Sequence, residues 1–311
     1  MPSAAPTWAT EVALAAFSWQ ELAQQVVSGL ASGGIYASLA LALVLIYRAT
    51  RVINFAQGEL ATLTTFVAWS LTNHGLNKWV AFPLTLLIAF AGGVALERVV
   101  IRPVERAPVL TVVMLTIGLL IGLNGLTAWI WGGETRSFPS LFSTGTVDVG
   151  GVAVSYADIG VIGVTLGAVG LISLFFRFTK LGLGMRAVAA NPETSPLVGI
   201  RVGWMLALGW GLAATLGALS GILVAPTVFL EPNMMQAILL YAFAAAILGG
   251  LESPLGAVVG GLLLGVILNL AGRYVPEVGG ESRLAVALAV ILIVLTIRPS
   301  GLFGRTVGRR V

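Results

Sequence analysis

Long apolar stretches, separated by short polar gaps, run along almost the whole chain. A helix that crosses the hydrocarbon core of a bilayer needs about 20 mostly apolar residues. Nine stretches without Asp, Glu, Lys or Arg approach that requirement: 22–47, 60–77, 79–96, 107–133, 159–176, 202–230, 232–251, 253–272 and 284–297. The pattern predicts an all-α polytopic membrane protein, with one transmembrane domain over 1–311 and about 8–10 spanning helices.

Two interruptions of this pattern predict broken or re-entrant segments. The stretch 60–77 has a polar end, 73–77, so we expect a shorter or re-entrant helix there. Between 244 and 261, a Gly-Gly pair, Glu252 and Pro254 interrupt a second apolar run. Interrupted segments in both halves of a chain are typical of transporters whose broken helices line a cavity. We expect the turn at Glu252 to lie on the same side of the membrane as the polar segment 54–59.

The basic residues predict the orientation, because Lys and Arg concentrate in short cytoplasmic loops. Residues 1–47 contain neither, so we place the N-terminus outside. Alternation of nine spans then assigns 13 of the 17 basic residues to the cytoplasmic side. The cytoplasmic segments are 48–59, 97–106, 177–201, the turn at Glu252 and the tail 298–311. If 60–77 instead dips in and returns, the N-terminus moves inside and the second half is unchanged.

Two features are predicted on the outer side. The segment 1–21 lacks the basic region of a signal peptide and reads as an interfacial segment anchored by Trp8 and Trp19. The exterior loop 132–158 has valines alternating around Gly150-Gly151, a hairpin pattern, so we expect a small β-ribbon there.

Composition agrees with a membrane protein and limits the chemistry. The chain is 58% hydrophobic and 10% charged, where soluble domains average about 25% charged residues. It has no Cys and one His, His74, which excludes disulfides, thiolate nucleophiles and multi-His metal sites. Neither Lys78 nor Lys180 follows a Gly, as a phosphate-binding loop requires. We expect no enzyme activity and no cofactor, so concentrative transport would need a partner that hydrolyses nucleotide.

The net charge of +4 points to a membrane rather than to nucleic acid, because the basic residues lie in gaps between apolar runs. Glycine pairs four residues apart recur within the runs. Such pairs let helix backbones approach closely in lipid, so we expect packing seams. The pairs are Gly29/Gly33, Gly118/Gly122, Gly163/Gly167, Gly217/Gly221, Gly256/Gly260 and Gly261/Gly265.

Polar residues enter the second apolar run directly after the first span ends. Asn54, Gln57 and Glu59 lie there, preceded by Arg48 and Arg51. Polar groups at a helix start can use its free N–H groups and its positive dipole end. Two interpretations stay open: Asn54 and Glu59 cap the helix and pair with the arginines, or they line a transport path.

A second polar segment, 179–201, lies between two spans on the basic side. We expect Gly182 and Gly184 to break the preceding span and a short helix to follow over 185–190. Asn191-Pro192-Glu193 fits the N-cap, N1 and N2 positions of another helix. Such a helix pair either docks a partner or is a plain connecting loop.

Several short motifs run in order along the chain between about residues 25 and 305. They are Gly34–Ala37, Arg51–Glu59, Glu97-Arg98, Arg102–Val104, Leu181-Gly182, Arg186-Ala187, Asn191–Glu193, Leu197–Ile200, Ala246–Gly250, Pro254–Ala257 and Arg298–Gly304. Together they resemble the membrane permease subunits of bacterial ABC importers for branched-chain amino acids. The stretch at 102–104 and the tail look more like the first of two paralogous permeases.

The resemblance implies a type II-like importer permease in the bacterial inner membrane, working by alternating access. Its implied partners are a second similar permease, two cytoplasmic ATPases that bind the ATP, and a periplasmic substrate-binding protein. The resemblance also assigns 183–200 to the ATPase-docking coupling helix. The implied contact patch consists of Arg186, Asn191, Glu193 and Gly199.

The resemblance places Asn54, Gln57 and Glu59 near the translocation path, and Glu252 is a further candidate. Gln57 stands where some relatives carry His, and Glu252 where relatives commonly have a small residue. Relatives also carry urea, amides or other neutral and polar amino acids, so the substrate stays open. A stand-alone channel or facilitator is the alternative from another class.

Overall fold

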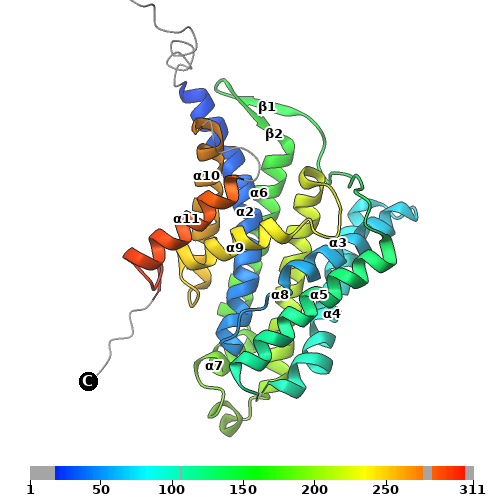
Figure 1. The fold of residues 1–311 in the computed structure, drawn as a ribbon, viewed down its shortest axis with the longest axis vertical. Coiled ribbons are helices and arrows are strands. Elements are labelled where there is room, and N and C mark those ends of the chain that lie inside the picture. The colour runs from blue at the N-terminus through cyan, green and yellow to red at the C-terminus, as the bar shows by residue number, and fades with distance from the viewer. Residues whose placement is uncertain (1–17, 106, 276–281, 305–311) are drawn as a thin grey trace, which may run out of the picture.

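The computed structural model describes residues 18–105, 107–275 and 282–304. These form a bundle of helices with a two-stranded hairpin at one end (Figure 1). The helices are α2 (Trp19–Thr50), α3 (Gln57–Asn73), α4 (Lys78–Leu96), α5 (Val109–Trp131), α6 (Tyr156–Phe178), α7 (Lys180–Ala190), α8 (Val202–Val228), α9 (Gln236–Gly249), α10 (Pro254–Tyr274) and α11 (Ser282–Ile297). Most of the predicted interfacial segment 1–21, and the tail after 304, lie outside the described residues.

Every predicted span contains a helix, but the helices differ in length. Within the described residues, six are long and apolar enough to cross a membrane: α2, α4 with its extension to Val104, α5, α6, α8 and α10. The others, α3, α9 and α11, have 17, 14 and 16 residues. At 1.5 Å per residue these measure about 21–26 Å, less than the hydrocarbon core of about 30 Å. The shorter segment predicted over 60–77 is therefore confirmed, whereas the full span predicted over 232–251 is wrong because 229–235 is not helical.

Two helices form the centre of the bundle, and the others surround them. In α2 and in α8, 83% of the apolar window is buried, whereas in α5 and α6 the share is 11%. The outer helices therefore present apolar side chains such as Ile121 and Leu171 at the surface. A lipid environment accommodates these side chains without the cost of exposing them to water.

The contact between α2 and α10 is a glycine seam, as predicted. A methyl group added at Gly33 would lie 2.8 Å from the Gly261 carbonyl oxygen, and one added at Gly29 would lie 2.8 Å from the Val266 Cα. Only hydrogen fits between these backbones, so the two helices approach as closely as small-residue seams allow in membranes.

The other glycine pairs divide into two groups. Gly217/Gly221 faces α3, and Gly256/Gly260 faces α9, so these seams are confirmed. Gly118/Gly122 on α5 and Gly163/Gly167 on α6 have nothing within 4 Å of an added Cβ among the described residues. The prediction of a seam within the chain is therefore wrong for these two pairs.

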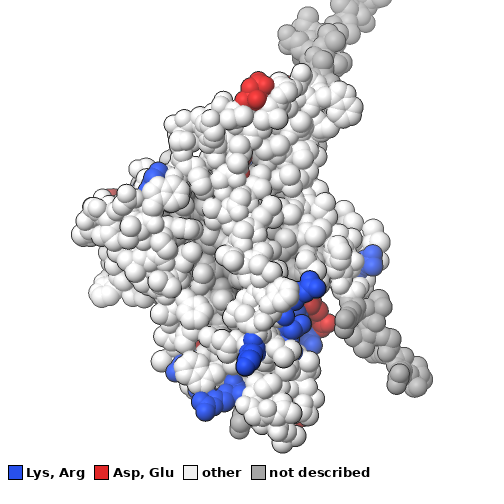
Figure 2. Space-filling model, turned by 180° about the vertical axis from the view of Figure 1, so that it is seen from behind, with Lys and Arg blue, Asp and Glu red and all other residues white. Residues whose placement is uncertain are grey.

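Segments predicted to share the cytoplasmic side gather at one end of the bundle, which we call the α7 end. Arg51 after α2 pairs there with Glu252 between α9 and α10. In the tail, Leu302 donates its backbone N–H to the Leu248 carbonyl, at 2.8 Å. Basic side chains concentrate toward this end in Figure 2, below a broad uncharged band. The exceptions are Asn54, Gln57 and Glu59, which are at most 3% exposed and lie deeper in the bundle than the prediction places them.

The opposite end, which we call the hairpin end, carries the predicted β-ribbon. Strands β1 (Thr146–Val149) and β2 (Val152–Ser155) are antiparallel, with Val149 opposite Val152. Gly150 and Gly151 join them with φ of +64° and +86°. Both values lie in the left-handed region, which a tight hairpin turn needs and glycine adopts without strain.

The seam predicts unequal effects of the same substitution. Gly261→Leu would force α2 and α10 apart, so we expect it to lower the free energy of unfolding by about 1–3 kcal/mol or more. Gly118→Leu is the matched control, since its Cβ points into open space. Denaturant titration of the purified chain in mixed micelles measures both. Equal stability of the two variants would contradict the seam.

Candidate functional site

The starts of α3 and α9 meet inside the bundle. A Cβ added at Gly58, in the first turn of α3, would lie 3.4 Å from the Leu239 Cβ of α9. The Gln57 Nε2 donates to the carbonyl of Ala213, at 2.8 Å, near the middle of α8. Both helices therefore begin partway through the bundle. From there α3 runs toward the hairpin end and α9, which lies across the bundle in Figure 1, runs toward the α7 end.

Irregular backbone over 51–56 and 229–235 leads to these helix starts. At membrane depth such backbone is stable only where protein covers it or where it lines a cavity. Here hydrogen bonds satisfy it. The Asn54 Oδ1 accepts from the Ala56 N–H at 3.1 Å. Leu230 and Arg136 exchange two backbone hydrogen bonds of 2.9 Å.

These contacts bear on the two interpretations left open for Asn54 and Glu59. The N-cap of α3 is Ala56, with no side-chain cap bond. Asn54 is 1% exposed and donates from Nδ2 to the Gln57 Oε1 at 3.1 Å. Glu59 is 3% exposed and accepts from Asn124. The prediction that Asn54 and Glu59 cap α3 is therefore wrong. Glu59 instead accepts a hydrogen bond from the side-chain amide of Asn124.

The Asn124 amide on α5 is the centre of a polar network. Its Nδ2 lies 3.1 Å from the Glu59 Oε2, 3.1 Å from the Pro232 carbonyl oxygen and 2.9 Å from the Asn233 Oδ1. Gln236 Nε2 also donates to that Asn233 oxygen, at 3.0 Å. An amide nitrogen carries two hydrogens, so Asn124 cannot serve three acceptors at once. Gln236 can serve the Asn233 oxygen while Asn124 serves the other two, and each of the three oxygens keeps a second lone pair for another donor.

Asn124 was missed in the sequence. The signal was present, because it is the only Asn within the apolar stretch 107–133. A polar amide at mid-membrane needs a partner, and here its partners belong to the starts of α3 and α9.

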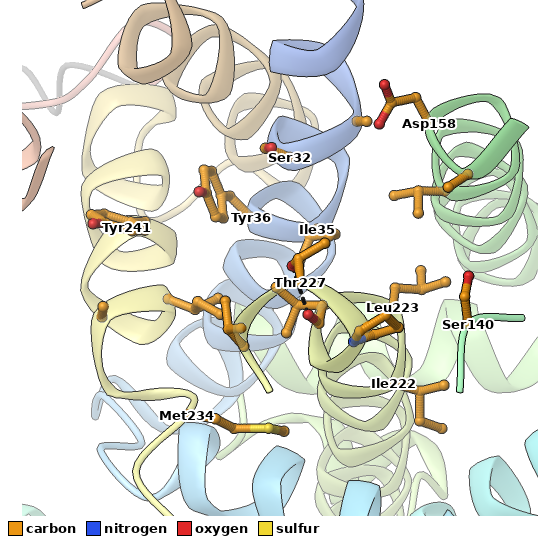
Figure 3. Close-up of a pocket in the computed structure, with 18 of the residues that line it drawn as sticks. Ser32, Ile35, Tyr36, Ser140, Asp158, Ile222, Leu223, Thr227, Met234 and Tyr241 are labelled. Atoms are coloured by element: carbon orange, nitrogen blue, oxygen red, sulfur yellow. Dashed lines mark hydrogen bonds between the residues drawn. The ribbon is translucent and has the colours of Figure 1, made fainter. Parts of the chain in front are cut away.

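An open cavity of about 560 Å³ extends from Asn233 toward the hairpin end. Its walls are mostly apolar and come from α2, α6, α8 and α9, as Figure 3 shows. Tyr36 and Tyr241 lie together on one side, with ring centroids 5.2 Å apart, and Asp158 lies across from them. Apolar lining residues include Ile35, Ile222, Leu223, Met234 and Ile238.

Charged groups of both signs line the same cavity. The Asp158 Oδ2 accepts from the Ser28 hydroxyl at 3.1 Å, and the Glu231 Oε2 accepts from Thr135 at 3.3 Å. The Arg283 guanidinium lies against Gly272, where an added Cβ would come within 3.0 Å of its nitrogens. The compartment can therefore contact a cation, an anion and a small apolar group of one ligand.

Glu252 lies apart from the other candidate path residues. It pairs with Arg51 at the α7 end, where the two side chains are 46% and 59% exposed. Its hydrogen bond raises the pKa of Arg51 above the ordinary value, so the guanidinium stays charged. The irregular segment of the second half that meets α3 is 229–235, because the turn around Glu252 only joins α9 to α10.

Helix α7 begins earlier than predicted. The chain is extended at Thr179, with φ −100° and ψ 150°, and the Thr179 hydroxyl caps α7 by accepting from the Gly182 N–H at 2.9 Å. The prediction that Gly182 and Gly184 break the preceding span is therefore wrong, since both lie inside α7. Gly182 instead allows contact with the backbone of Phe176 at the end of α6.

The predicted docking residues are all exposed at the α7 end: Arg186, Asn191, Glu193 and Gly199. Asn191 accepts from the N–H groups of Glu193 and Thr194, at 3.1 Å each, but Pro192 and Glu193 are not helical and Thr194 is the N-cap of the next element, so the predicted N-cap at Asn191 is wrong. A short 3₁₀ turn, Ser195–Val198, follows in place of the expected α-helix. Leu197 and Val198 on that turn are 84% and 74% exposed, although the predicted contact patch did not include them.

The fold and the cavity define a multi-pass membrane permease, and comparison with known sequences identifies its family. The family model described as branched-chain amino acid transport system / permease component matches residues 25–296. The chain belongs to this family, so the resemblance to permease subunits of branched-chain amino-acid ABC importers is confirmed. It is a multi-pass protein of the inner membrane.

Individual relatives agree over nearly the whole chain. The high-affinity branched-chain amino acid transport system permease protein BraD of Pseudomonas aeruginosa is 31% identical, over 91% of this chain and 95% of the relative. LivH of Salmonella typhimurium is 29% identical over the same shares. Among solved structures, PsaBC from Streptococcus pneumoniae in complex with Fab aligns over 94% of this chain and 97% of its own, at 16% identity and TM-score 0.48.

The network around Asn124 predicts that Asn124→Leu lowers the transport rate by more than its loss of stability alone would explain. The variant leaves Glu59 without its amide donor, so we expect transport to fall at least about tenfold and stability by about 1–3 kcal/mol. Asn269→Leu is the matched control, because Asn269 donates to the Gln25 carbonyl at 2.9 Å outside the network. Uptake and unfolding are measured for both. Equal loss of transport in the control would reduce Asn124 to a structural role.

Proposed function

We propose that the chain is the membrane-spanning permease subunit of an ATP-driven importer and that it translocates branched-chain amino acids. The observation that supports this substrate is the cavity beside Asn233, with Asp158, Glu231 and Arg283 around apolar walls. A branched-chain amino acid has an ammonium group, a carboxylate and a small apolar body, which these groups complement. The relatives' names describe transport of the same substrates.

In this proposal the substrate enters from the hairpin end, which the distribution of Lys and Arg places outside. Asp158 and Glu231 attract the ammonium group, and Arg283 attracts the carboxylate. The side chain packs against the apolar wall near Ile35. Binding here needs few polar contacts, which suits a subunit that must release its substrate again.

The polar network forms the floor of this compartment and the barrier to further passage. An arriving ammonium group can donate to the second lone pair of an oxygen in this network, such as the Glu59 carboxylate. The starts of α3 and α9 direct free N–H groups and positive dipole ends toward the same region, which favours a carboxylate. Asn54 and Gln57 hold the start of α3 against α8 and so position this barrier.

At the α7 end, the pair of Arg51 and Glu252 joins α2 to the turn between α9 and α10. Passage into the cytoplasm requires α9 to move relative to α2. Glu252 therefore acts on the path as part of an inner closure rather than as a substrate contact. In this proposal Glu252 is still a residue of the translocation path, but it lies nearer the α7 end than Glu59 does.

Energy for transport comes from partners. The proposed assembly contains a second similar permease, two cytoplasmic ATPases that bind ATP, and a periplasmic binding protein. The chain itself is not an enzyme and needs no cofactor in this proposal. The 179–201 segment docks an ATPase through Arg186, Asn191, Glu193 and Gly199, and the exposed Leu197 and Val198 fill an apolar recess of the partner.

Docking is tested by charge reversal. Arg186→Glu combined with Glu193→Arg should reduce co-purification of the ATPases at least about tenfold, because it inverts the charge pattern of the patch. The matched control reverses Arg273 and Glu21, a pair with 3.3 Å between Nη2 and Oε1 at the hairpin end. An intact complex after the first change would overturn the docking assignment.

Uptake tests the function itself. Proteoliposomes with the complete assembly should concentrate leucine only when ATP reaches the ATPases, and Glu59→Gln should lower the rate at least about tenfold with assembly unchanged. Glu134→Gln, at an exposed loop position, is the control. If the chain alone equilibrates leucine or urea without ATPases, it is a channel. If Glu59→Gln transports normally, Glu59 is structural.

A further inference from the structure

A second cavity, of about 260 Å³, lies at the α7 end of the bundle. It shares no lining residue with the larger cavity, and the mechanism above does not use it. Its walls come from the end of α2, the turn after α4, the start of α5, α7 and α8. Most of its lining is apolar, and the branched apolar side chains are Val52, Ile101, Val109, Val112, Val188, Val202 and Leu206.

Two buried polar groups line this cavity without a partner. Glu97 is 1% exposed, and neither of its carboxylate oxygens has a hydrogen-bond partner among the described residues. Trp210 is 2% exposed, and its indole Nε1 also lacks an acceptor there. Leaving a buried polar group unpaired costs about 1–3 kcal/mol, and more for a charged group. Such groups in a native protein therefore call for an explanation, and a ligand supplies one.

The backbone around Glu97 is also unusual. Residues Glu97–Ile101 form a π-helical turn that continues α4. Single π-turns inside helices are rare and occur frequently at functional sites. Here the turn carries both Glu97 and Ile101 on the wall of the cavity. The irregularity and the unpaired carboxylate therefore coincide at one place.

We propose that this cavity binds a branched-chain amino acid from the α7 side. The ammonium group of the ligand donates to Glu97, its carboxylate accepts from the Trp210 Nε1–H, and its side chain contacts the valines. The choice of ligand rests on the function proposed above. The volume lies below the roughly 300–1,000 Å³ of pockets for drug-sized ligands, which suits one small molecule.

Occupancy of this cavity has a consequence for the transport cycle. Val188 and Pro192 of the coupling segment line it, and so does Arg51 of the inner closure. A ligand that fits the cavity only while the coupling segment and Arg51 keep their present positions stabilises this conformation of the protein relative to its other conformations. Substrate that accumulates in the cytoplasm therefore slows the movement of the coupling segment. The site is a brake on import by its own product.

The chain has no cysteine, so a single introduced thiol reports on each cavity. Val112→Cys places the thiol in the smaller cavity, and Val161→Cys places it in the larger one. Both positions are buried, at 7% and 8% exposure. A small methanethiosulfonate reagent modifies the purified full chain in detergent, with and without leucine, and mass spectrometry follows the rate.

We expect leucine to slow modification at both positions at least tenfold. Glu97→Gln and Trp210→Phe should each abolish protection at position 112 and preserve it at 161. Leucinol, which lacks the carboxylate, and 4-methylpentanoate, which lacks the ammonium group, should protect position 112 at least tenfold more weakly. Unchanged melting temperatures of the Glu97→Gln and Trp210→Phe chains confirm that they are folded.

The outcomes separate this proposal from the proposed function. Protection at 161 without protection at 112 overturns the second site and leaves the transport assignment intact. Protection at 112 that survives both Glu97→Gln and Trp210→Phe also overturns it. Protection at 112 without protection at 161 supports the second site and contradicts the assignment of the larger cavity. Absence of protection at both positions contradicts both.

Discussion

The contact between the starts of two short helices, α3 and α9, is the constraint on which this structure depends. Each start requires irregular backbone at membrane depth, which lipid cannot satisfy with hydrogen bonds. Asn124 bonds to both regions, and Gln57 fixes α3 to the Ala213 carbonyl of α8. Gly217 and Gly221 of α8 have no side chains, and this allows α3 to pack closely against α8. Of the two central helices, α8 packs against α3 and α2 packs against α9.

The junction divides the bundle into two compartments with different chemistry. On the hairpin side lies a cavity with charged groups of both signs. On the α7 side lies a smaller, mostly apolar cavity, where the Glu97 carboxylate has no hydrogen-bond partner within the described part of the chain. The pair of Arg51 and Glu252 lies at the α7 end. A barrier at mid-depth with a compartment on either side is the arrangement that alternating access requires.

Features that depend on the conformation or size of neighbouring residues could be predicted from the sequence. The hairpin at Gly150-Gly151 and the α2–α10 seam follow from turn geometry and small-residue packing. The sequence could not separate Gly29/Gly33 from Gly118/Gly122, because their spacing is identical and only the fold decides which pair meets a neighbour. It also could not show that Asn124 meets Glu59, since 64 residues that include α4 lie between them.

A disulfide between α3 and α9 tests the central contact most directly. The built Gly58 Cβ lies 3.4 Å from the Leu239 Cβ, close to the separation that a disulfide spans, and the chain has no native cysteine. Gly58→Cys with Leu239→Cys should form an intramolecular disulfide on mild oxidation, and that bond should stop leucine uptake until it is reduced. Failure to form the bond, or full transport by the oxidised protein, would contradict a closing junction between these helices.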